Sequence, residues 1–220
     1  MFIINCKNYD EIAGDKIIKI AKISERISNK YKVPIAIAPP HHLIPLITKF
    51  KITVLAQHVD DKKVGSTTGF MVPEIVKKSK INGSIINHSE HRISEKEIIS
   101  LVKRLQKLKL KTVLCVKNVN EAKKFAKLNP TFIAIEPPEL IGTGRAISTE
   151  KPALITNAVK AVSSAKNSTK LLCGAGIVSG QDVSKAKELG SKGILVASGI
   201  VKAKNWEKII SEFCKGLKSQ

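Results

Sequence analysis

Residues 84–116 read SIINHSEHRISEKEIISLVKRLQKLKLKTVLCV, and this stretch decides the fold class. It begins with one short apolar run, Ser84–Asn87, and ends with another, Thr112–Val116. Between them, Ser94–Leu108 opens with Ser-Glu-Lys-Glu, a capping box in which Ser94 is the N-cap residue. The apolar residues that follow recur at helical spacing. The stretch therefore predicts a strand, a helix and a second strand, the unit from which α/β proteins are built.

The same alternation of a short apolar run with an amphipathic segment continues over the whole chain. The other apolar runs are Phe2–Asn5, Pro34–Ala38, Thr53–Gln57, Phe132–Glu136, Lys170–Gly174 and Gly193–Ala197. Further segments with helical spacing are Asn118–Lys127, Ser179–Leu189 and Asn205–Leu217. Most of the runs are continuously apolar, as strands covered on both faces must be.

Eight strand–helix units in one chain of 220 residues predict an α/β fold, a (β/α)8 barrel that forms a single domain over residues 1–220. A doubly wound parallel sheet is the alternative that periodicity alone leaves open. Polar and glycine residues follow the carboxyl end of nearly every predicted strand, where barrel active sites are assembled. That placement favours the barrel.

The chain is strongly basic, with a formal net charge of +20. Nucleic-acid binding is the first interpretation of such a charge. However, the lysines are spread along the whole chain, only four arginines are present, and aromatic residues make up 4%. We therefore interpret most of the charge as a lysine-rich surface in solvent, without a specific nucleic-acid partner. The positive field would still draw in a small phosphate dianion.

No apolar run approaches the roughly 20 residues that span a bilayer. The apolar residues 1–5 are followed at once by a charged, polar stretch, so we expect no signal peptide and no membrane partner. We expect a cytoplasmic location instead.

The cysteines are Cys6, Cys115, Cys173 and Cys214, and their spacing fits neither a metal site nor a small disulfide scaffold. Three of them lie in or beside apolar segments, where buried free cysteine is the ordinary outcome.

Candidate catalytic residues follow the predicted strands. The polar, glycine and other small residues at these ends are Asn5, Lys7, Gln57, His58, His88, Glu90, Glu136, Gly174, Gly176, Ala197 and Ser198. In a barrel they converge on one face. A carboxylate, an imidazole and an ammonium around one pocket can move a proton beside a carbonyl group, so we expect no metal and no organic cofactor. Glu136 stands out because a carboxylate that ends an apolar strand is costly to bury.

A second constellation follows the last two predicted strands. Gly174-Ala175-Gly176 comes after the seventh and Ala197-Ser198-Gly199 after the eighth. Small residues let backbone N–H groups approach an anion closely. Each glycine pair alone is as well explained by a simple turn, but together they occupy the usual phosphate site of such barrels.

Taken together, four motifs resemble triosephosphate isomerase, a TIM barrel, over essentially the whole chain. They are Asn5-Cys6-Lys7, the Gly65–Gly69 segment after the third strand, His88-Ser89-Glu90, and Glu136-Pro137 leading into Ile141-Gly142-Thr143-Gly144. Any single one of these motifs is unspecific. Their order, each at the appropriate strand end, makes the resemblance specific, and the shortened chain is similar to the compact archaeal branch of the family.

The resemblance implies a role for each catalytic candidate. Glu136 would be the base that shuttles a proton between two carbons of the triose. His88 would be the neutral electrophile that polarises the carbonyl, a division of roles that comes with the family and not from the spacing. Lys7 would offset negative charge, Asn5 would position a substrate oxygen, and Glu90 would order the neighbouring network. The implied reaction interconverts dihydroxyacetone phosphate and D-glyceraldehyde 3-phosphate, a step of glycolysis and gluconeogenesis.

The resemblance also implies substrate-binding positions and a closing lid over residues 137–144. The substrate-binding residues would be Asn5, Lys7, Ile141, Gly142, Gly176, Ala197 and Ser198. The chain departs from the family where Glu139 replaces a common Trp and Cys173 a common Tyr. The remaining histidines, His41, His42, His58 and His91, are interpreted as structural or solvated.

Two positions bear on how copies of the chain assemble. Phe70 and His91 occupy positions where the family commonly has a cross-subunit Glu–Arg pair. We nevertheless expect a homo-oligomer, a tetramer in preference to a dimer, in which Thr68 lies near the tip of a loop that reaches a neighbouring subunit. The alternative functions are another phosphate-binding barrel enzyme, such as a sugar-phosphate isomerase or a lyase, and a basic nucleic-acid-binding protein.

Overall fold

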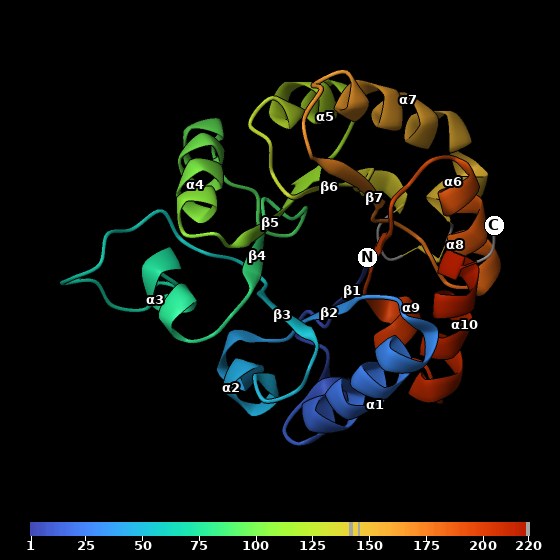
Figure 1. The fold of residues 1–220 in the computed structure, drawn as a ribbon, viewed down its shortest axis with the longest axis horizontal. Helices are drawn as coiled ribbons and strands as arrows, with labels where there is room; N and C mark the ends of the chain where they lie inside the picture. Colours follow the sequence, from blue (N-terminus) through green and yellow to red (C-terminus); the bar gives the residue numbers. More distant parts are fainter. Residues whose placement is uncertain (141–142, 145, 219–220) are drawn as a thin grey trace.

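Eight parallel strands close into a barrel in the computed structural model, which describes residues 1–140, 143–144 and 146–218 (Figure 1). The strands are β1 (Phe2–Asn5), β2 (Ile35–Ala38), β3 (Thr53–Ala56), β4 (Gly83–Ile86), β5 (Lys111–Val116), β6 (Phe132–Ile135), β7 (Lys170–Cys173) and β8 (Ile194–Val196). They follow one another around the barrel in sequence order, and β1 pairs with β8 to close it, with Phe2 opposite Ile194. The predicted (β/α)8 TIM barrel is confirmed.

Helices surround the barrel on all sides (Figure 1). They are α1 (Lys16–Tyr31), α2 (Ile44–Ile47), α3 (Pro73–Lys78), α4 (Glu95–Lys107), α5 (Val119–Ala126), α6 (Ile147–Glu150), α7 (Pro152–Ser163), α8 (Gly180–Glu188), α9 (Ser198–Val201) and α10 (Trp206–Lys218). Short 3-10 turns are η1 (Asp10–Ile12), η2 (His41–Leu43) and η3 (Pro138–Leu140). The predicted capping box is present at α4, where the Glu97 N–H donates to Ser94 Oγ and the Ser94 N–H donates to a Glu97 carboxylate oxygen.

Several predicted strands are one residue too long at the carboxyl end. Glu136, Gln57 and Asn87 each lie just beyond the strand that was expected to contain them. For Asn87 the reason is its backbone, which has a φ of 58° and therefore cannot continue an extended strand. The polar residues thus leave the sheet at its rim, where their side chains can turn toward a common pocket.

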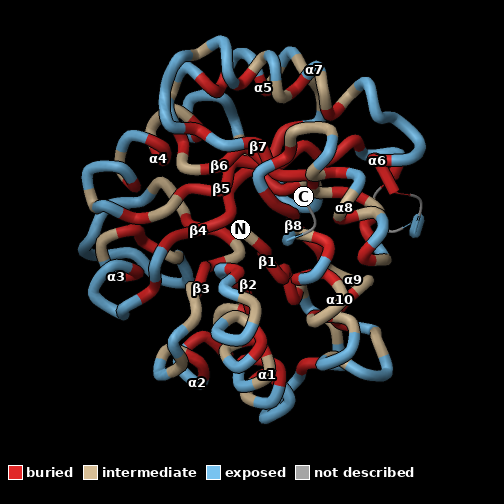
Figure 2. Tube along the Cα trace, turned by 45° about the vertical axis from the view of Figure 1, so that its right-hand side comes forward, coloured by how far each residue is buried: buried red, intermediate tan, exposed pale blue. Residues whose placement is uncertain are grey.

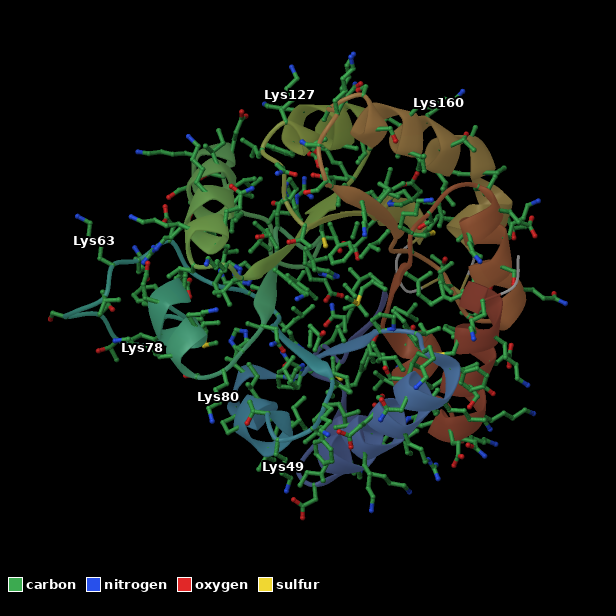
Figure 3. All side chains as sticks on the ribbon, viewed as in Figure 1. Lys49, Lys63, Lys78, Lys80, Lys127 and Lys160 are labelled. Carbon is green, nitrogen blue, oxygen red and sulfur yellow. The ribbon has the colours of Figure 1, made fainter. Side chains whose placement is uncertain are left out.

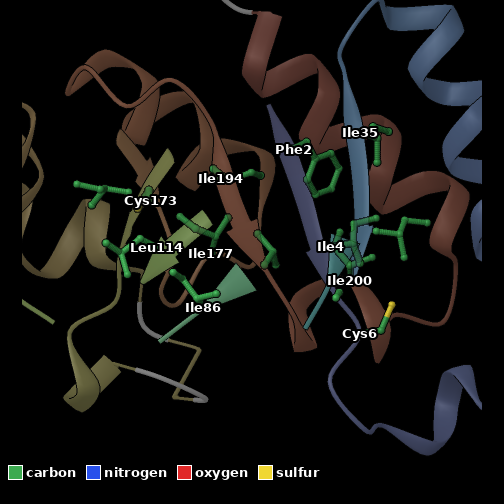
Figure 4. Packing of buried hydrophobic residues seen from close by; sticks show 14 of the residues in the cluster. Phe2, Ile4, Cys6, Ile35, Ile86, Leu114, Cys173, Ile177, Ile194 and Ile200 are labelled. Atoms are coloured by element: carbon green, nitrogen blue, oxygen red, sulfur yellow. The ribbon is translucent and has the colours of Figure 1, made fainter. Parts of the chain in front are cut away.

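Two apolar clusters form the core, one inside the barrel and one between the strands and the helices. The buried residues follow the strands of the barrel (Figure 2), and Figure 4 shows part of the outer cluster. Because successive side chains of a strand point to opposite faces, Ile3 lies inside the barrel while Phe2 and Ile4 pack outward against the helices. Phe2 meets Phe213 of α10, with 5.7 Å between the ring centroids.

All four cysteines are buried, and burial raises the pKa of the Cys6 thiol to about 12. The expectation of buried cysteines therefore holds.

Lysine side chains radiate from the outside of the barrel in every direction (Figure 3). The six labelled lysines, Lys49, Lys63, Lys78, Lys80, Lys127 and Lys160, are all exposed, and only Lys78 and Lys80 among them are close in sequence. This distribution agrees with a solvated surface and not with one basic face. Among the described residues, no helix combines the length and the hydropathy needed to cross a membrane.

Candidate active site

A pocket opens at the carboxyl ends of the strands and collects most of the predicted site residues. Its lining includes Asn5, Lys7, His88, Glu136, Gly174, Gly176, Ala197 and Ser198. Glu90 lines an adjoining cavity that shares Asn5, Lys7 and His88 with this pocket. Ile141 and Gly142, two of the predicted substrate contacts, lie outside the described residues. The structure therefore brings together residues at the carboxyl ends of β1, β4, β6, β7 and β8.

Glu136 is the first residue beyond β6 and the most deeply buried carboxylate of the site. Its N–H donates to the Val116 carbonyl at 2.8 Å, and the residue is 4% exposed. Oε1 lies 3.4 Å from Nε2 of His88, whereas Oε2 is buried without a hydrogen-bond partner. A buried carboxylate oxygen without a partner is destabilising, and it is free to accept a proton from a bound molecule.

The loop that carries His88 is held by the side chain of the preceding residue. Asn87 Nδ2 donates to the Cys115 carbonyl at 2.9 Å, and its Oδ1 accepts from the Ile93 N–H at 3.2 Å. The left-handed backbone of Asn87, a conformation that Asn tolerates well, turns the chain from β4 toward the pocket. Asn87 was predicted to be the last residue of a strand, and this role was not predicted, although an Asn after an apolar run is itself a turn signal.

The hydrogen bonds of His88 define which of its ring nitrogens carries the proton. Nδ1 accepts from the Glu90 N–H at 3.2 Å, so in the neutral ring the hydrogen is on Nε2, which faces Glu136. Burial acts to lower the pKa of His88, but the hydrogen bond to Glu136 and its charge outweigh that effect and raise the pKa. The pair thus combines a proton acceptor and an N–H donor at the same point of the pocket.

Replacing Glu136 with glutamine should lower the pKa of His88. The substitution keeps the shape of the side chain and removes the charge that stabilises the imidazolium, which leaves burial to act with less opposition. An NMR titration of the His88 ring measures the change. Glu90→Gln is the control, because Glu90 is 57% exposed and solvent weakens its effect. A larger fall in Glu90→Gln than in Glu136→Gln would contradict the assignment of cause.

Lys7 reaches the pocket from an unusual backbone conformation. Its φ is 45°, in the left-handed region that non-glycine residues adopt only where neighbours hold them. The Lys7 N–H donates to Asn5 Oδ1 at 3.0 Å, which fixes the turn after β1. The ammonium Nζ lies 2.6 Å from Oε1 of Glu90 and so connects the ends of β1 and β4.

Gln57 holds Lys7 from the other side, a role that sequence analysis did not assign. Its Nε2 donates to the Lys7 carbonyl at 2.9 Å and to the Ala38 carbonyl at 3.1 Å. Both acceptors are backbone groups near strand ends. Gln57 thereby joins the ends of β1, β2 and β3 at the edge of the pocket. Only the three-dimensional contact, over 50 residues of sequence for Lys7, shows this function.

Gln57→Glu should lower the free energy of unfolding by about 1–3 kcal/mol, because a carboxylate oxygen would face two carbonyl oxygens in place of a donor. Urea unfolding monitored by circular dichroism measures the change. Gln106→Glu is the matched control, since Gln106 also donates to two backbone carbonyls, those of Leu128 and Asn129, but at an exposed position. Equal losses in the two variants would show that burial at the pocket edge is not the cause.

The predicted phosphate loops lie side by side in the pocket. Gly176, with a φ of 68°, follows β7, and Ala197 and Ser198 lead into α9. The first N–H groups of a helix have no partner within it and are available to other acceptors. Gly199 passes so close to the loop after β7 that a Cβ atom would lie 2.6 Å from the Ile177 carbonyl oxygen. Glycine at this position allows the two loops to touch.

Gly174→Ala should lower kcat by about tenfold, because small displacements of a catalytic group reduce turnover strongly. A Cβ atom at this position would lie 2.6 Å from Cγ of Glu136 and 3.2 Å from the Ile135 carbonyl oxygen. Since the backbone oxygen cannot move easily, the Glu136 side chain must shift. Steady-state kinetics of the purified variant measure the effect, and an unchanged kcat would contradict it.

The described part of the predicted lid contains a contact that the sequence did not indicate. Glu139, in the turn η3, forms an ion pair with Lys151, between α6 and α7. Both side chains are exposed, so solvent screens the pair. Gly144, with a φ of 72°, lines the pocket at the other end of the segment.

No group of three or more His, Cys, Asp and Glu side chains is arranged to hold a metal ion in residues 1–140, 143–144 and 146–218.

Comparisons with known proteins show what the whole chain is similar to. A family model described as triosephosphate isomerase matches residues 1–213. The triosephosphate isomerase of Cenarchaeum symbiosum is 52% identical over 217 residues, which cover 99% of this chain and 97% of the relative. Those of Methanocaldococcus jannaschii and Methanothermus fervidus are 41% and 40% identical, with coverage of 98% and 96% of this chain and of 99% and 96% of the relatives.

Proposed function

Because the chain belongs to the triosephosphate isomerase family, we propose that it interconverts dihydroxyacetone phosphate and D-glyceraldehyde 3-phosphate. The observation that carries the proposal is the pairing of Glu136 Oε1 with His88 Nε2 at 3.4 Å, beside two loops suited to a phosphate group. The reaction moves a proton between adjacent carbons of the substrate. It needs a base of the protein at those carbons and a hydrogen-bond donor of the protein at the neighbouring oxygen. The proposed activity implies a role in glycolysis and gluconeogenesis in the cytoplasm.

In the first step of the proposed mechanism, Glu136 removes a proton from the hydroxyl-bearing carbon of dihydroxyacetone phosphate. The electron pair of that C–H bond forms a carbon–carbon double bond, and the carbonyl oxygen gains negative charge. His88 stabilises this oxygen through its Nε2–H, and proton transfer through His88 moves a hydrogen from one oxygen to the other. Glu136 then returns its proton to the neighbouring carbon, which gives the aldehyde isomer without net gain or loss of atoms.

Lys7 and Asn5 would stabilise the enediolate, the intermediate that carries the carbon–carbon double bond and the negatively charged oxygen. The Lys7 ammonium faces the pocket while it contacts Glu90, so it can compensate charge on the enediolate and on the phosphate group. Asn5 would orient a substrate oxygen with the amide that also fixes the Lys7 turn. Glu90, through its N–H to His88 Nδ1 and its carboxylate to Lys7, would order both groups.

Backbone amides at Gly176, Ala197 and Ser198 would hold the phosphate, together with Ile141 and Gly142 of the lid, which lie outside the described residues. Anchoring the phosphate fixes the reacting carbons relative to Glu136. Closure of the lid would exclude water, which matters because an exposed enediolate phosphate can eliminate its phosphate group.

The test is a coupled assay with D-glyceraldehyde 3-phosphate on the purified protein in buffer without added metal. We expect turnover, and inhibition by inorganic phosphate that competes with substrate. Another phosphate-binding barrel enzyme would share the phosphate loops but not the Asn-x-Lys, His-Ser-Glu and Glu-Pro motifs. Turnover of a longer sugar phosphate in preference to the triose would therefore support that alternative and count against the proposal.

We further propose a homo-oligomer, a tetramer in preference to a dimer, in which residues 57–72 (loop 3) reach a neighbouring copy. Loop 3 extends away from the barrel between β3 and α3 (Figure 1). It carries Val64 and Phe70, which are 55% and 45% exposed. Such side chains are costly in water and suit an interface. Analytical ultracentrifugation that gives a monomer at micromolar concentration would contradict this proposal.

A further inference from the structure

All five histidines of the chain line one cavity of about 700 Å³ beside the catalytic pocket. His88 serves the proposed reaction, which leaves His41, His42, His58 and His91 without an assigned function. The proposed reaction does not require this concentration of imidazoles.

Two of these rings are stacked face to face. His58 follows β3 and is buried, His91 follows β4 and is exposed, and their ring centroids are 4.0 Å apart with 19° between the planes. Neutral aromatic rings attract one another in such an arrangement. Two imidazolium cations at the same distance repel. The stability of the contact therefore depends on how many protons the pair carries.

On one side, the stack is tied to the base of loop 3. His58 Nε2 lies 3.5 Å from Asp60 Oδ1. Asp60 Oδ2 accepts from the Met71 N–H at 2.7 Å, and the Asp60 N–H donates to the Met71 carbonyl at 2.9 Å. Asp60 thus joins the two ends of loop 3 and contacts the buried ring as well.

On the other side, the stack contacts the segment His88–His91, which contains the proposed electrophile and is called the catalytic loop below. The His91 N–H donates to the His88 carbonyl at 2.8 Å, and only Glu90 and Ser89 separate the two residues in sequence. Glu90 contacts Lys7 and His88. The two stacked rings therefore connect the base of loop 3 with the segment that positions the proposed electrophile.

The charges around the stack allow one added proton more easily than two. Asp60 is the carboxylate paired with His58, while the described ion pairs give His91 no carboxylate within 4.0 Å. The other charged or titratable groups that line the cavity are Lys7, Tyr9, His41, His42, His88 and Glu90. Outside its lining, the carboxylate of Glu97 on α4 interacts electrostatically with His58. His41 Nε2 is buried without a partner, so a proton there would also be poorly stabilised.

The pKa values of His58 and His41 are both shifted in the direction that disfavours added protons. Burial is the main cause that lowers the pKa of His58, helped by the neighbouring His91 and opposed by Asp60. Burial likewise lowers the pKa of His41. A histidine whose pKa is lowered in the closed state leaves that state fully stable above the unperturbed pKa, near 6.5, and destabilises it as the pH falls below.

We propose that the His58–His91 stack is an acid-sensitive joint that closes loop 3 onto the catalytic loop near neutral pH and opens when both rings take up a proton. The opening separates Asp60 and the base of loop 3 from the segment His88–His91. This device goes beyond the proposed reaction, because it requires no substrate and uses histidines that the mechanism does not employ.

The first experiment measures opening by amide hydrogen exchange at pH 7.5 and pH 5.5, with rates corrected for the intrinsic effect of pH. In the wild-type protein, exchange by opening of residues 57–61 and 88–92 should rise on the order of tenfold at the lower pH. His91→Phe keeps a ring on His58 but cannot be protonated, so it should abolish most of the rise. The control His42→Phe, at an exposed position in the same cavity, should behave as the wild type.

The second experiment follows the ring signals of the wild-type protein in an NMR titration, which keeps the proposal testable if His91→Phe does not fold. Coupled rings titrate in two separated steps that belong to the pair. Separated steps for His58 and His91 support the joint, whereas independent single steps overturn it. Equal acid-induced opening in the wild type and in His91→Phe, or no opening in the wild type, overturns it as well.

Discussion

Replacing Glu136 with aspartate should lower kcat by on the order of a hundredfold or more, because a catalytic group displaced by about 1 Å can lose that much. The aspartate side chain is shorter by one methylene group. The backbone cannot move to compensate, since the Glu136 N–H is bonded to Val116 and the preceding residue is fully buried in β6. The carboxylate therefore withdraws from the substrate while its chemistry is unchanged.

The coupled triose phosphate assay, with kcat and KM determined separately, measures this effect. KM should change much less than kcat, because the proposed phosphate contacts come from other strands. Glu188→Asp is a suitable control, since Glu188 is exposed on α8 and pairs with Lys185 far from the pocket. Activity that is indifferent to Glu136 would refute the assignment of the base, even if the family assignment remained.

The proximity of Glu136 and His88 could be predicted from the sequence because the barrel determines where strand ends lie. Once residues 132–136 and 84–87 are recognised as parallel strands, Glu136 and His88 must meet at the same end of the barrel. The prediction was less accurate at the rim itself, where Asn87 and Glu136 leave the sheet. Strand periodicity reports which face is buried, but it does not report where a left-handed turn ends the strand.

Contacts between distant loops could not be predicted in this way. Gln57 acts on Lys7, His58 stacks on His91, and Glu139 pairs with Lys151. Each of these contacts depends on the side-chain geometry of loops that no local pattern encodes. His58 and His91 illustrate the limit: as single residues both were interpreted as structural or solvated, and only their 4.0 Å stacking gives them a common function to test.

Amide side chains hold the loops at the rim of the pocket. Glu136 Oε2 lacks a partner, and Lys7 holds a left-handed backbone, so two unfavourable features adjoin in one pocket. The side chains that restrain the surrounding loops are Asn5, Gln57 and Asn87, all of them amides that bond backbone groups. Neutral amides suit this task because they restrain the loops without adding charge beside the proposed enediolate.

Lys7→Met should lower kcat/KM on the order of a thousandfold, since removing a single preorganised charge-stabilising group typically costs that much. Methionine keeps a long unbranched stem, and as another non-glycine residue it leaves the strain of the left-handed backbone unchanged. The folded state should lose little stability, because the partner Glu90 is 57% exposed and such ion pairs contribute at most about 1 kcal/mol. The expected signature is thus a severe loss of activity in a protein that unfolds at nearly the wild-type temperature.

Lys185→Met separates this effect from the general loss of one lysine. Lys185 is exposed on α8 and pairs with Glu188, whose exposure of 57% equals that of Glu90. Both substitutions remove one positive charge from a chain of net charge +20, so the net charge of the two variants is the same and only the position of the lost charge differs. If Lys7→Met retained more than about a tenth of the wild-type kcat/KM, the ammonium would be contributing no more than a weak, solvent-screened interaction. Enediolate stabilisation would then have to come from His88 and the backbone amides alone.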